Sequence, residues 1–185
     1  MALSRPIYNF LGFYFEQLFN HPVRTKSITS CTVATAGALA SQSLSGQKIN
    51  PRAVFAYSIF GLLFGGSVPH YFFNFFESVV PDVPYKKLIE FLLERSVFAP
   101  VFTAMSLYFL SIFEGKSPEQ ALKTLQQLYL TVLTTNWRYL SLPVFINFNF
   151  VPLFLRVFVA NLIGFFWIIY LADKRRRAAA KKENN

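Results

Sequence analysis

The chain has 185 residues, of which 54% are hydrophobic and only 15% are charged, and 23 of them are phenylalanine. Soluble domains carry charge on about a quarter of their residues, so this composition argues against an ordinary soluble globule and favours a protein embedded in lipid. The net charge of +9 is concentrated toward the C-terminus, where it flanks an apolar stretch and therefore indicates a membrane surface and not nucleic acid.

The first predicted element is a short amphipathic helix in the N-terminal segment, residues 1–21, which ends at His21-Pro22. Its many aromatic residues predict that it lies at the membrane interface. The segment lacks a basic start followed by an apolar run and a small-residue cleavage site, which argues against a cleavable signal peptide. The presence of Arg5, with no acid before Glu16, is compatible with import into mitochondria.

Residues 22–45 predict the first membrane span. No charged residue lies between Ser27 and Ser45, and most residues there are small. Small residues allow helices to approach closely in a membrane, so this span is expected inside the bundle and shielded from lipid. Cys31 is the only cysteine, which excludes an intramolecular disulfide and indicates a packing role.

Two longer spans are predicted next, at residues 52–78 and 85–114, and the PDVP turn (81–84) separates them. Gly65-Gly66 and Pro69 are expected to bend or loosen the first of the two. A membrane span needs about 20 predominantly apolar residues, and both stretches are long enough.

An amphipathic helix at about 117–134 follows, and its start is clearly marked. Ser117 as N-cap, Pro118 at the first helical position and Gln120 at the third make a good helix start. An apolar stripe opposite a polar face predicts that this helix lies at the interface or packs on the bundle.

The last predicted span, residues 150–172, follows an aromatic- and Asn-rich link and ends in a basic tail, residues 173–185. The tail holds six Lys or Arg against Asp173 and Glu183, a charge pattern that favours anionic lipid headgroups as a partner. It has no interleaved aromatic residues on which bases could stack, so nucleic acid is not an expected partner.

Together these elements predict an all-α fold, a four-transmembrane-helix bundle over residues 22–172 with amphipathic interfacial helices. Four spans place both termini on one side of the membrane. The basic tail is then expected to face the compartment from which insertion began.

Arg156 lies six residues, about 9 Å at a rise of 1.5 Å per residue, inside the last predicted span. A charge at the bilayer centre costs about 2.5–3.5 kcal/mol on insertion scales, so it normally reaches the interface, pairs or faces water. Two interpretations stay open. The side chain snorkels to the headgroups, or it pairs with Glu94 or Glu77 inside the bundle.

Three further polar residues stand out beside apolar runs. Glu94 and Arg95 are adjacent and therefore do not face one another on an α-helix, so each is expected to find a partner elsewhere. Glu90 and Glu94 share a helix face, which favours a solvated helix end. His70, beside Pro69, is expected to form structural hydrogen bonds, with a proton-relay or ligand role as the alternative.

Catalytic motifs are missing from the sequence. It has two histidines and one cysteine, with no G-x-S-x-G, no HExxH, no Gly-rich phosphate loop and no convincing paired-carboxylate site. The sequence therefore predicts a protein that is not an enzyme and that uses no metal or cofactor.

The stretch NWRYLSLPVFINFNFVPLFLRVFVANLIGFFWIIYLA, residues 136–172, resembles the C-terminal signature of the Mpv-seventeen/peroxisomal membrane protein 2 family. The family pattern combines an Asn-Phe pair, Val-Pro, Arg-Val and Trp-x-x-Tyr-Leu, and its signature residues here are Asn147, Pro152, Arg156, Trp167 and Tyr170. Upstream, HPVRTKSITS, SVPHYFFNFFE and LLERSVFAP resemble parts of the family's first three spans.

The resemblance implies a four-span protein of the peroxisomal membrane or of the mitochondrial inner membrane, without deciding between the two. Family members are described as weakly selective channels for small solutes, linked to metabolite and redox homeostasis. The expected function is therefore a small-solute channel. Its candidate pore-lining or gating residues are Gln42, His70, Glu94, Arg95 and Arg156.

A different class of function stays open. Broad aromatic faces can pack against proteins as well as against lipid, so the alternative is a non-catalytic structural subunit of a larger mitochondrial membrane complex. A homo-oligomer is compatible with either function.

Overall fold

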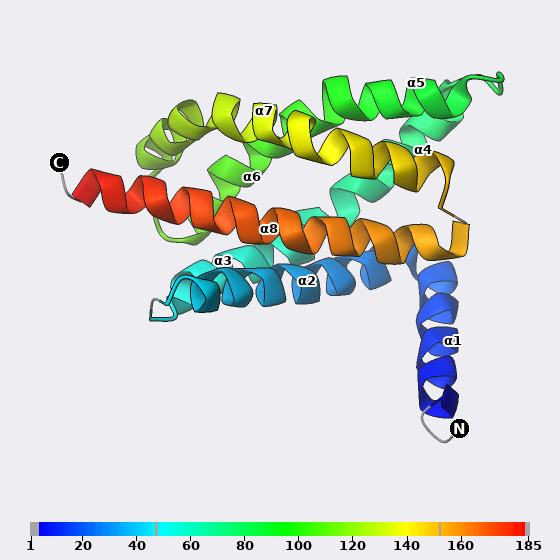
Figure 1. Ribbon diagram of the computed structural model, residues 1–185, viewed down its shortest axis with the longest axis horizontal. Helices are drawn as coiled ribbons and strands as arrows, with labels where there is room; N and C mark the ends of the chain where they lie inside the picture. Colours follow the sequence, from blue (N-terminus) through cyan, green and yellow to red (C-terminus); the bar gives the residue numbers. More distant parts are fainter. Residues whose placement is uncertain (1–3, 47, 152, 184–185) are drawn as a thin grey trace.

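The computed structural model describes residues 4–46, 48–151 and 153–183, with side chains for residues 8–46, 48–151 and 159–180. Every regular element in these ranges is helical (Figure 1), which confirms the all-α class. The α-helices are α1 (Ser4–Asn20), α2 (Pro22–Leu44), α3 (Pro51–Phe60), α4 (Ser67–Val79), α5 (Lys86–Leu93), α6 (Ala99–Phe113), α7 (Pro118–Asn149) and α8 (Leu153–Glu183). Two π-helical stretches, η1 (Gly61–Gly65) and η2 (Glu94–Phe98), lie between α-helices.

Two of the predicted spans form continuous helical rods. The rod α3–η1–α4 runs over Pro51–Val79, and the rod α5–η2–α6 runs over Lys86–Phe113. Among helices whose residues are all described, these two are long and apolar enough to cross a membrane. Only 28% and 33% of their most apolar windows are buried inside the protein, so most of that apolar surface faces outward, as lipid-facing helices require.

The other two predicted spans are helical but are not established as spans. α2 has the predicted length, yet it falls outside the group of helices apolar enough to cross a membrane. α8 contains the predicted span 150–172, and the side chains of its first turns lie outside the described residues. A bundle with four spans therefore remains a prediction.

The helix predicted at 117–134 is much longer than expected. Its capping box is confirmed, since the Ser117 hydroxyl accepts from Gln120 N and Ser117 N donates to the Gln120 side chain, both at 3.3 Å. The helix α7 then continues through the predicted link to Asn149, with Pro143 inside it. An irregular link would leave backbone groups unpaired beside apolar surface, whereas a helix bonds them internally. At the end of α7 the side-chain amide of Asn149 also donates to Phe145 O, at 2.9 Å.

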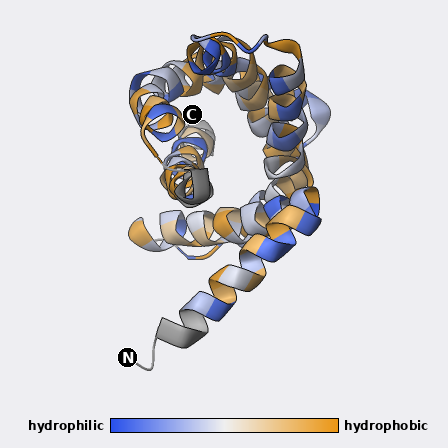
Figure 2. Cartoon of the chain, turned by 90° about the vertical axis from the view of Figure 1, so that its right-hand side faces the viewer, coloured by the Kyte–Doolittle hydropathy of each residue, from blue (hydrophilic) through white to orange (hydrophobic). Residues whose placement is uncertain are grey.

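The helices of the bundle are arranged as a closed ring (Figure 2). α2 packs against α3 and α8, α3 against α6, α6 against α7, and α7 against α8, which completes the circuit. Five helical segments, including the full length of α7, thus enclose the interior, where four had been predicted.

Side chains fill the middle of this ring. Buried residues of α2, α3, α6, α7 and α8 form one hydrophobic core, with Leu107 and Leu110 of α6 almost fully inaccessible. Aromatic rings add to it between α3 and α6, where Phe60 and Phe102 have centroids 5.7 Å apart. Further along, Phe64 and Phe109 are 4.8 Å apart.

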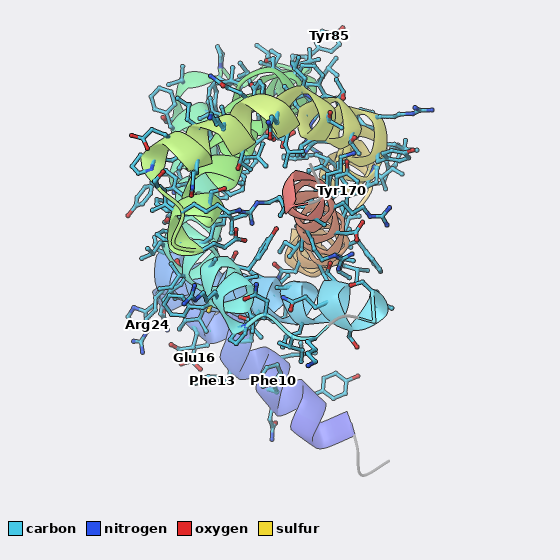
Figure 3. The ribbon with its side chains drawn as sticks, turned by 90° about the vertical axis from the view of Figure 1, so that its left-hand side faces the viewer. Phe10, Phe13, Glu16, Arg24, Tyr85 and Tyr170 are labelled. Atoms are coloured by element: carbon cyan, nitrogen blue, oxygen red, sulfur yellow. The ribbon has the colours of Figure 1, made fainter. Side chains whose placement is uncertain are left out.

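The N-terminal helix α1 projects from one end of the bundle, roughly across the direction of the other helices (Figures 1 and 3). It contacts α2, where Tyr14 Oη lies 3.2 Å from Thr29 Oγ1. Large apolar side chains on it face outward, with Phe19 91% and Tyr8 72% exposed. These positions suit an interfacial helix, and that assignment stays a prediction.

Candidate functional site

A buried ion pair joins the C-terminal part of α8 to the turn after α6. The Arg175 guanidinium donates to both carboxylate oxygens of Glu114, at 2.8 and 3.0 Å. Its side chain is only 4% exposed and that of Glu114 only 17%. This two-point geometry is the strong form of an Arg–carboxylate contact, and it links residues 61 positions apart in sequence.

Polar groups from neighbouring elements surround this pair. Arg175 also donates to Ser111 Oγ of α6 at 3.2 Å, and its guanidinium carbon lies 5.7 Å from the centre of the Tyr57 ring of α3. Lys116 Nζ approaches the same Glu114 carboxylate at 2.9 Å. The Tyr57 hydroxyl is buried and has no hydrogen-bond partner among the described residues. We call Tyr57, Ser111, Glu114 and Arg175 the end cluster.

The protonation of Arg175 follows from these neighbours. Burial by itself lowers the pKa of its guanidinium, whereas its interactions with Tyr57 and Glu114 raise it, and the net direction is upward. The residue lies beyond the predicted span 150–172 and stays charged at every physiological pH.

Two cavities flank the end cluster. One, of about 420 Å³, lies between the start of α3 and the turn after α6, where Arg52, Phe113 and Glu114 contribute to its lining. The other, of about 250 Å³, lies between the end of α2 and residues 169–177 of α8. Both are open toward the outside of the bundle, at the end where the C-terminus lies (Figure 1).

A second buried charged group lies at the π-helical stretch η2. Glu94 is only 6% exposed, and Arg95 pairs with it through two guanidinium nitrogens, Nη2 lying 2.5 Å from Glu94 Oε1. The expectation that these adjacent residues find partners elsewhere is therefore wrong for Glu94. The π-helical turn is wider than an α-turn, and the long side chain of Arg95 folds back along it to reach its neighbour.

Arg95 also connects η2 to α7. Its Nη1 donates to Asn136 Oδ1 at 2.9 Å, and Trp137 Nε1 donates to the carbonyl oxygen of Arg95 at 2.8 Å. Asn136 is 8% exposed. We call Glu94, Arg95 and Asn136 the η2 cluster.

His70 lies in a third polar group, at the other end of α2. Its Nδ1 is 3.2 Å from Lys26 Nζ, and its Nε2 is 3.2 Å from the side-chain amide of Asn74. An ammonium group only donates, so Nδ1 accepts and the neutral ring carries its hydrogen on Nε2. These contacts agree with a structural hydrogen-bonding role for His70.

Of the five predicted pore residues, the four whose side chains are described do not gather in one site. Glu94 and Arg95 contact each other. Gln42, 8% exposed, accepts from Asn50 N at 2.5 Å and braces the turn between α2 and α3. The side chain of Arg156 lies outside the described residues, so its snorkelling or pairing is untested.

Two of the family-signature residues hold α8 against the bundle. Trp167 and Tyr170 stack with centroids 5.1 Å apart. Tyr170, labelled in Figure 3, donates to Thr135 Oγ1 of α7 at 3.1 Å. Asn147 is half-buried on α7, and Pro152 lies outside the described residues.

The end cluster was missed by the sequence reasoning. Arg175 was assigned to a solvated basic tail, because it follows the apolar span and stands in a run of four basic residues. Its partner Glu114 was placed at the end of a span. The available signal was the long helical continuation after residue 172, which keeps Arg175 on the same helix face as Leu171, four residues earlier.

Metal chemistry finds no support in the described part of the chain, where no three His, Cys, Asp or Glu side chains gather closely enough to hold an ion. The two buried clusters combine acidic and basic groups with hydroxyl and amide groups. Such surroundings can receive small polar solutes of either charge.

Comparisons with known proteins identify related chains. Residues 111–172 match the model of the Mpv17 / PMP22 family. The chain is 30% identical to peroxisomal membrane protein 2 of Bos taurus over 172 residues, covering 88% of each chain. It is 29% identical to peroxisomal membrane protein PMP22 of Arabidopsis thaliana over 95% of each. It is also 29% identical to mitochondrial inner membrane protein Mpv17 of Drosophila melanogaster, over 63% of this chain and 71% of that one. No solved structure matches.

Proposed function

The chain belongs to the Mpv17 / PMP22 family, and we propose that it is a small-solute channel or permeability protein of an organelle membrane. Its relatives carry the names of peroxisomal and mitochondrial inner-membrane proteins. The protein is accordingly assigned to one of these two membranes, as a multi-pass protein.

The burial of ionisable side chains inside a ring of helices carries this proposal. Arg175 and Glu94 are each only 6% exposed. A charge inside a membrane span is costly and is by default a sign of function. Glu94 lies inside the predicted span 85–114, and Arg175 lies just beyond the predicted span 150–172. Here the charges belong to two clusters on the elements that form the ring, and a structural protein held together by apolar contacts does not require them.

The proposed path runs through the interior from the end cluster to the η2 cluster. Packed aromatic rings, Phe60, Phe64 and Phe109 among them, lie on α3, η1 and α6 between these polar groups. The conformation described is therefore closed, and conduction requires these rings or the helices that bear them to move. Since both clusters contain acidic and basic groups, the open path would discriminate only weakly by charge.

Flux through reconstituted vesicles tests the proposal. We expect purified protein to release a small labelled solute and to retain a large dextran. Neutralising the buried pair singly, by Glu114→Gln or Arg175→Gln, should change the release rate at least severalfold. Lys123→Gln is the matched control, because Lys123 is exposed on α7 and lines neither cluster. Vesicles that stay sealed with clean wild-type protein would refute the channel.

The exposed apolar surface, much of it aromatic, favours the second candidate, a non-catalytic structural subunit of a larger membrane assembly. Phe150 is 73%, Leu130 71% and Phe75 60% exposed, and such surfaces can be covered by protein as well as lipid. Native gels after gentle detergent extraction distinguish the candidates. Migration only as a monomer or small homo-oligomer would remove the scaffold role.

A further inference from the structure

The basic run at residues 174–177 is divided by the helix among different surroundings. Arg175 points into the bundle and pairs with Glu114. Arg176 turns toward α2, where it donates to Ser41 O at 3.2 Å and to the Ser45 hydroxyl. Arg177 faces outward, with its side chain 75% exposed. Three consecutive arginines therefore lie in the interior, at a helix–helix contact and on the outer surface.

Arg176 and Arg177 border the 250 Å³ cavity between α2 and α8, and they share one acidic partner. Both contact the carboxylate of Asp173, Arg177 through Nε at 2.7 Å. Two guanidinium groups against one carboxylate leave one unit of positive charge uncompensated. The Arg177 side chain is 75% exposed, so its terminal nitrogens are accessible to a further anion.

The walls of this cavity change from polar to apolar along the helices. Leu44, which is 78% exposed, and Ile169 line it together with the charged residues. Ile169 belongs to the apolar stretch of α8, and Asp173 begins the basic one. The cavity thus lies where a lipid headgroup would meet its acyl chains. It is at the end of the bundle where α2 joins α3 and α6 joins α7 (Figure 1). Lys48 and Lys116 lie in these two connections, and Arg52 lies at the start of α3.

We propose that this cavity is a binding site for an anionic phospholipid. The lipid phosphate would accept hydrogen bonds from the Arg177 terminal nitrogens, in the forked geometry that guanidinium groups favour with phosphate. Arg176, already engaged with α2, supplies charge and fixes the cavity wall. The acyl chains lie along Leu44 and Ile169. The site faces outward from the ring and is independent of whether the interior conducts solutes.

Titration of detergent-purified full-length protein with defined lipids tests this site. We expect phosphatidylglycerol to raise the unfolding temperature and to remain bound in native mass spectra, and phosphatidylcholine to do neither. Loss of a hydrogen bond to a charged phosphate corresponds to about tenfold in affinity. Arg177→Gln should therefore weaken phosphatidylglycerol binding about tenfold, and Arg177→Lys less.

Two further variants make the test specific. Lys174→Gln removes the same charge from the same helix, but Lys174 does not line the cavity, so it should change binding less than twofold. Asp173→Asn removes the shared carboxylate and should tighten binding. Equal losses for Lys174→Gln and Arg177→Gln would overturn the site in favour of diffuse attraction. Inorganic phosphate that competes at concentrations similar to the lipid would overturn the lipid assignment.

Discussion

The pairing of Glu114 with Arg175 shows how a residue in a turn can hold a deeply buried cation, since the Arg175 side chain is only 4% exposed and that of Glu114 17%. Glu114 follows α6, and it accepts from Arg175 and Lys116 together. Its carboxylate is therefore opposed by two cations, of which only Arg175 is deeply buried. Breaking a buried pair by removing one partner leaves an uncompensated charge, whereas replacing both partners avoids that cost.

Glu114→Gln should accordingly destabilise the protein more than the double variant that removes both charges of the pair. Removing one partner of a buried ion pair costs about 3–5 kcal/mol, so we expect a clearly lower midpoint of thermal unfolding. The double variant Glu114→Gln/Arg175→Met removes both charges and should regain a substantial part of that loss. The measurement is unfolding of the detergent-solubilised protein followed by circular dichroism.

The exposed pair on the same helix provides the control. Arg177→Gln breaks the contact with Asp173, but Arg177 is 75% exposed, and exposed pairs contribute only about 0–1 kcal/mol. Its midpoint should stay near that of the wild type. A double variant less stable than Glu114→Gln alone would contradict the view that the unpaired charge is what costs stability.

Prediction from the sequence was weakest at the scale of single ionisable residues. Glu94 and Arg95 were recognised as unusual from their apolar neighbours, but their mutual contact depends on a π-helical turn that composition does not show. Arg175 was hidden in a basic run whose usual location is solvent. Both errors have one physical source, since the partner of a buried charge is fixed by tertiary packing and not by its sequence neighbours.

Close contact between α2 and the junction of η1 with α4 determines how the first two helical segments fit together. At Gly66 an added Cβ would lie 2.3 Å from Ser27 N and 2.5 Å from Lys26 C, both backbone atoms. Backbone atoms cannot turn aside as a flexible side chain can. Glycine here allows the two helices to approach closely, as small residues do in membrane bundles.

Gly66→Ala should therefore lower the stability of the protein, because the methyl group forces α2 away from η1 and α4. We expect a loss on the order of 1–3 kcal/mol, the usual range for overpacking in a well-packed interior. Thermal unfolding in detergent measures it.

Gly164→Ala is the matched control, since nothing lies within 4 Å of an added Cβ at that position of α8. Alanine is preferred to glycine in helices by about 1 kcal/mol, so this variant should be neutral or more stable. If Gly66→Ala were equally well tolerated, the close approach of α2 would not be a constraint on the fold.

Helix starts were predicted better than helix ends. The capping box at Ser117 and the turn before Pro51 follow local rules, because side chains there satisfy backbone groups a few residues away. The end of α7 follows no local rule. The aromatic- and Asn-rich stretch suggested a link, yet the helix continues to Asn149, with Pro143 inside it, because its surroundings favour internally bonded backbone.

At the scale of the whole molecule, the continuation of α7 adds a fifth helical segment to the ring, although α7, like α2, is not among the helices long and apolar enough to cross a membrane. α7 has 32 residues, a length of about 48 Å at 1.5 Å per residue, which exceeds the roughly 30 Å of a bilayer core. It lies beside α8 and α6 as a full member of the ring. An interfacial helix of residues 117–134 alone would have left a ring of four.

This difference predicts the sidedness of the chain. With α2, α3–α4, α5–α6, α7 and α8 running alternately along the bundle, α1 and the C-terminus lie at opposite ends (Figure 1). Epitope tags at the two termini should then differ in intact organelles, one being removed by added protease and the other only after the membrane is permeabilised. The four-span arrangement predicts that both tags behave alike. If added protease removed both tags from intact organelles, α7 would not cross the membrane with its neighbours. Four crossing segments would then enclose the polar interior, and α7 would lie against them from one side.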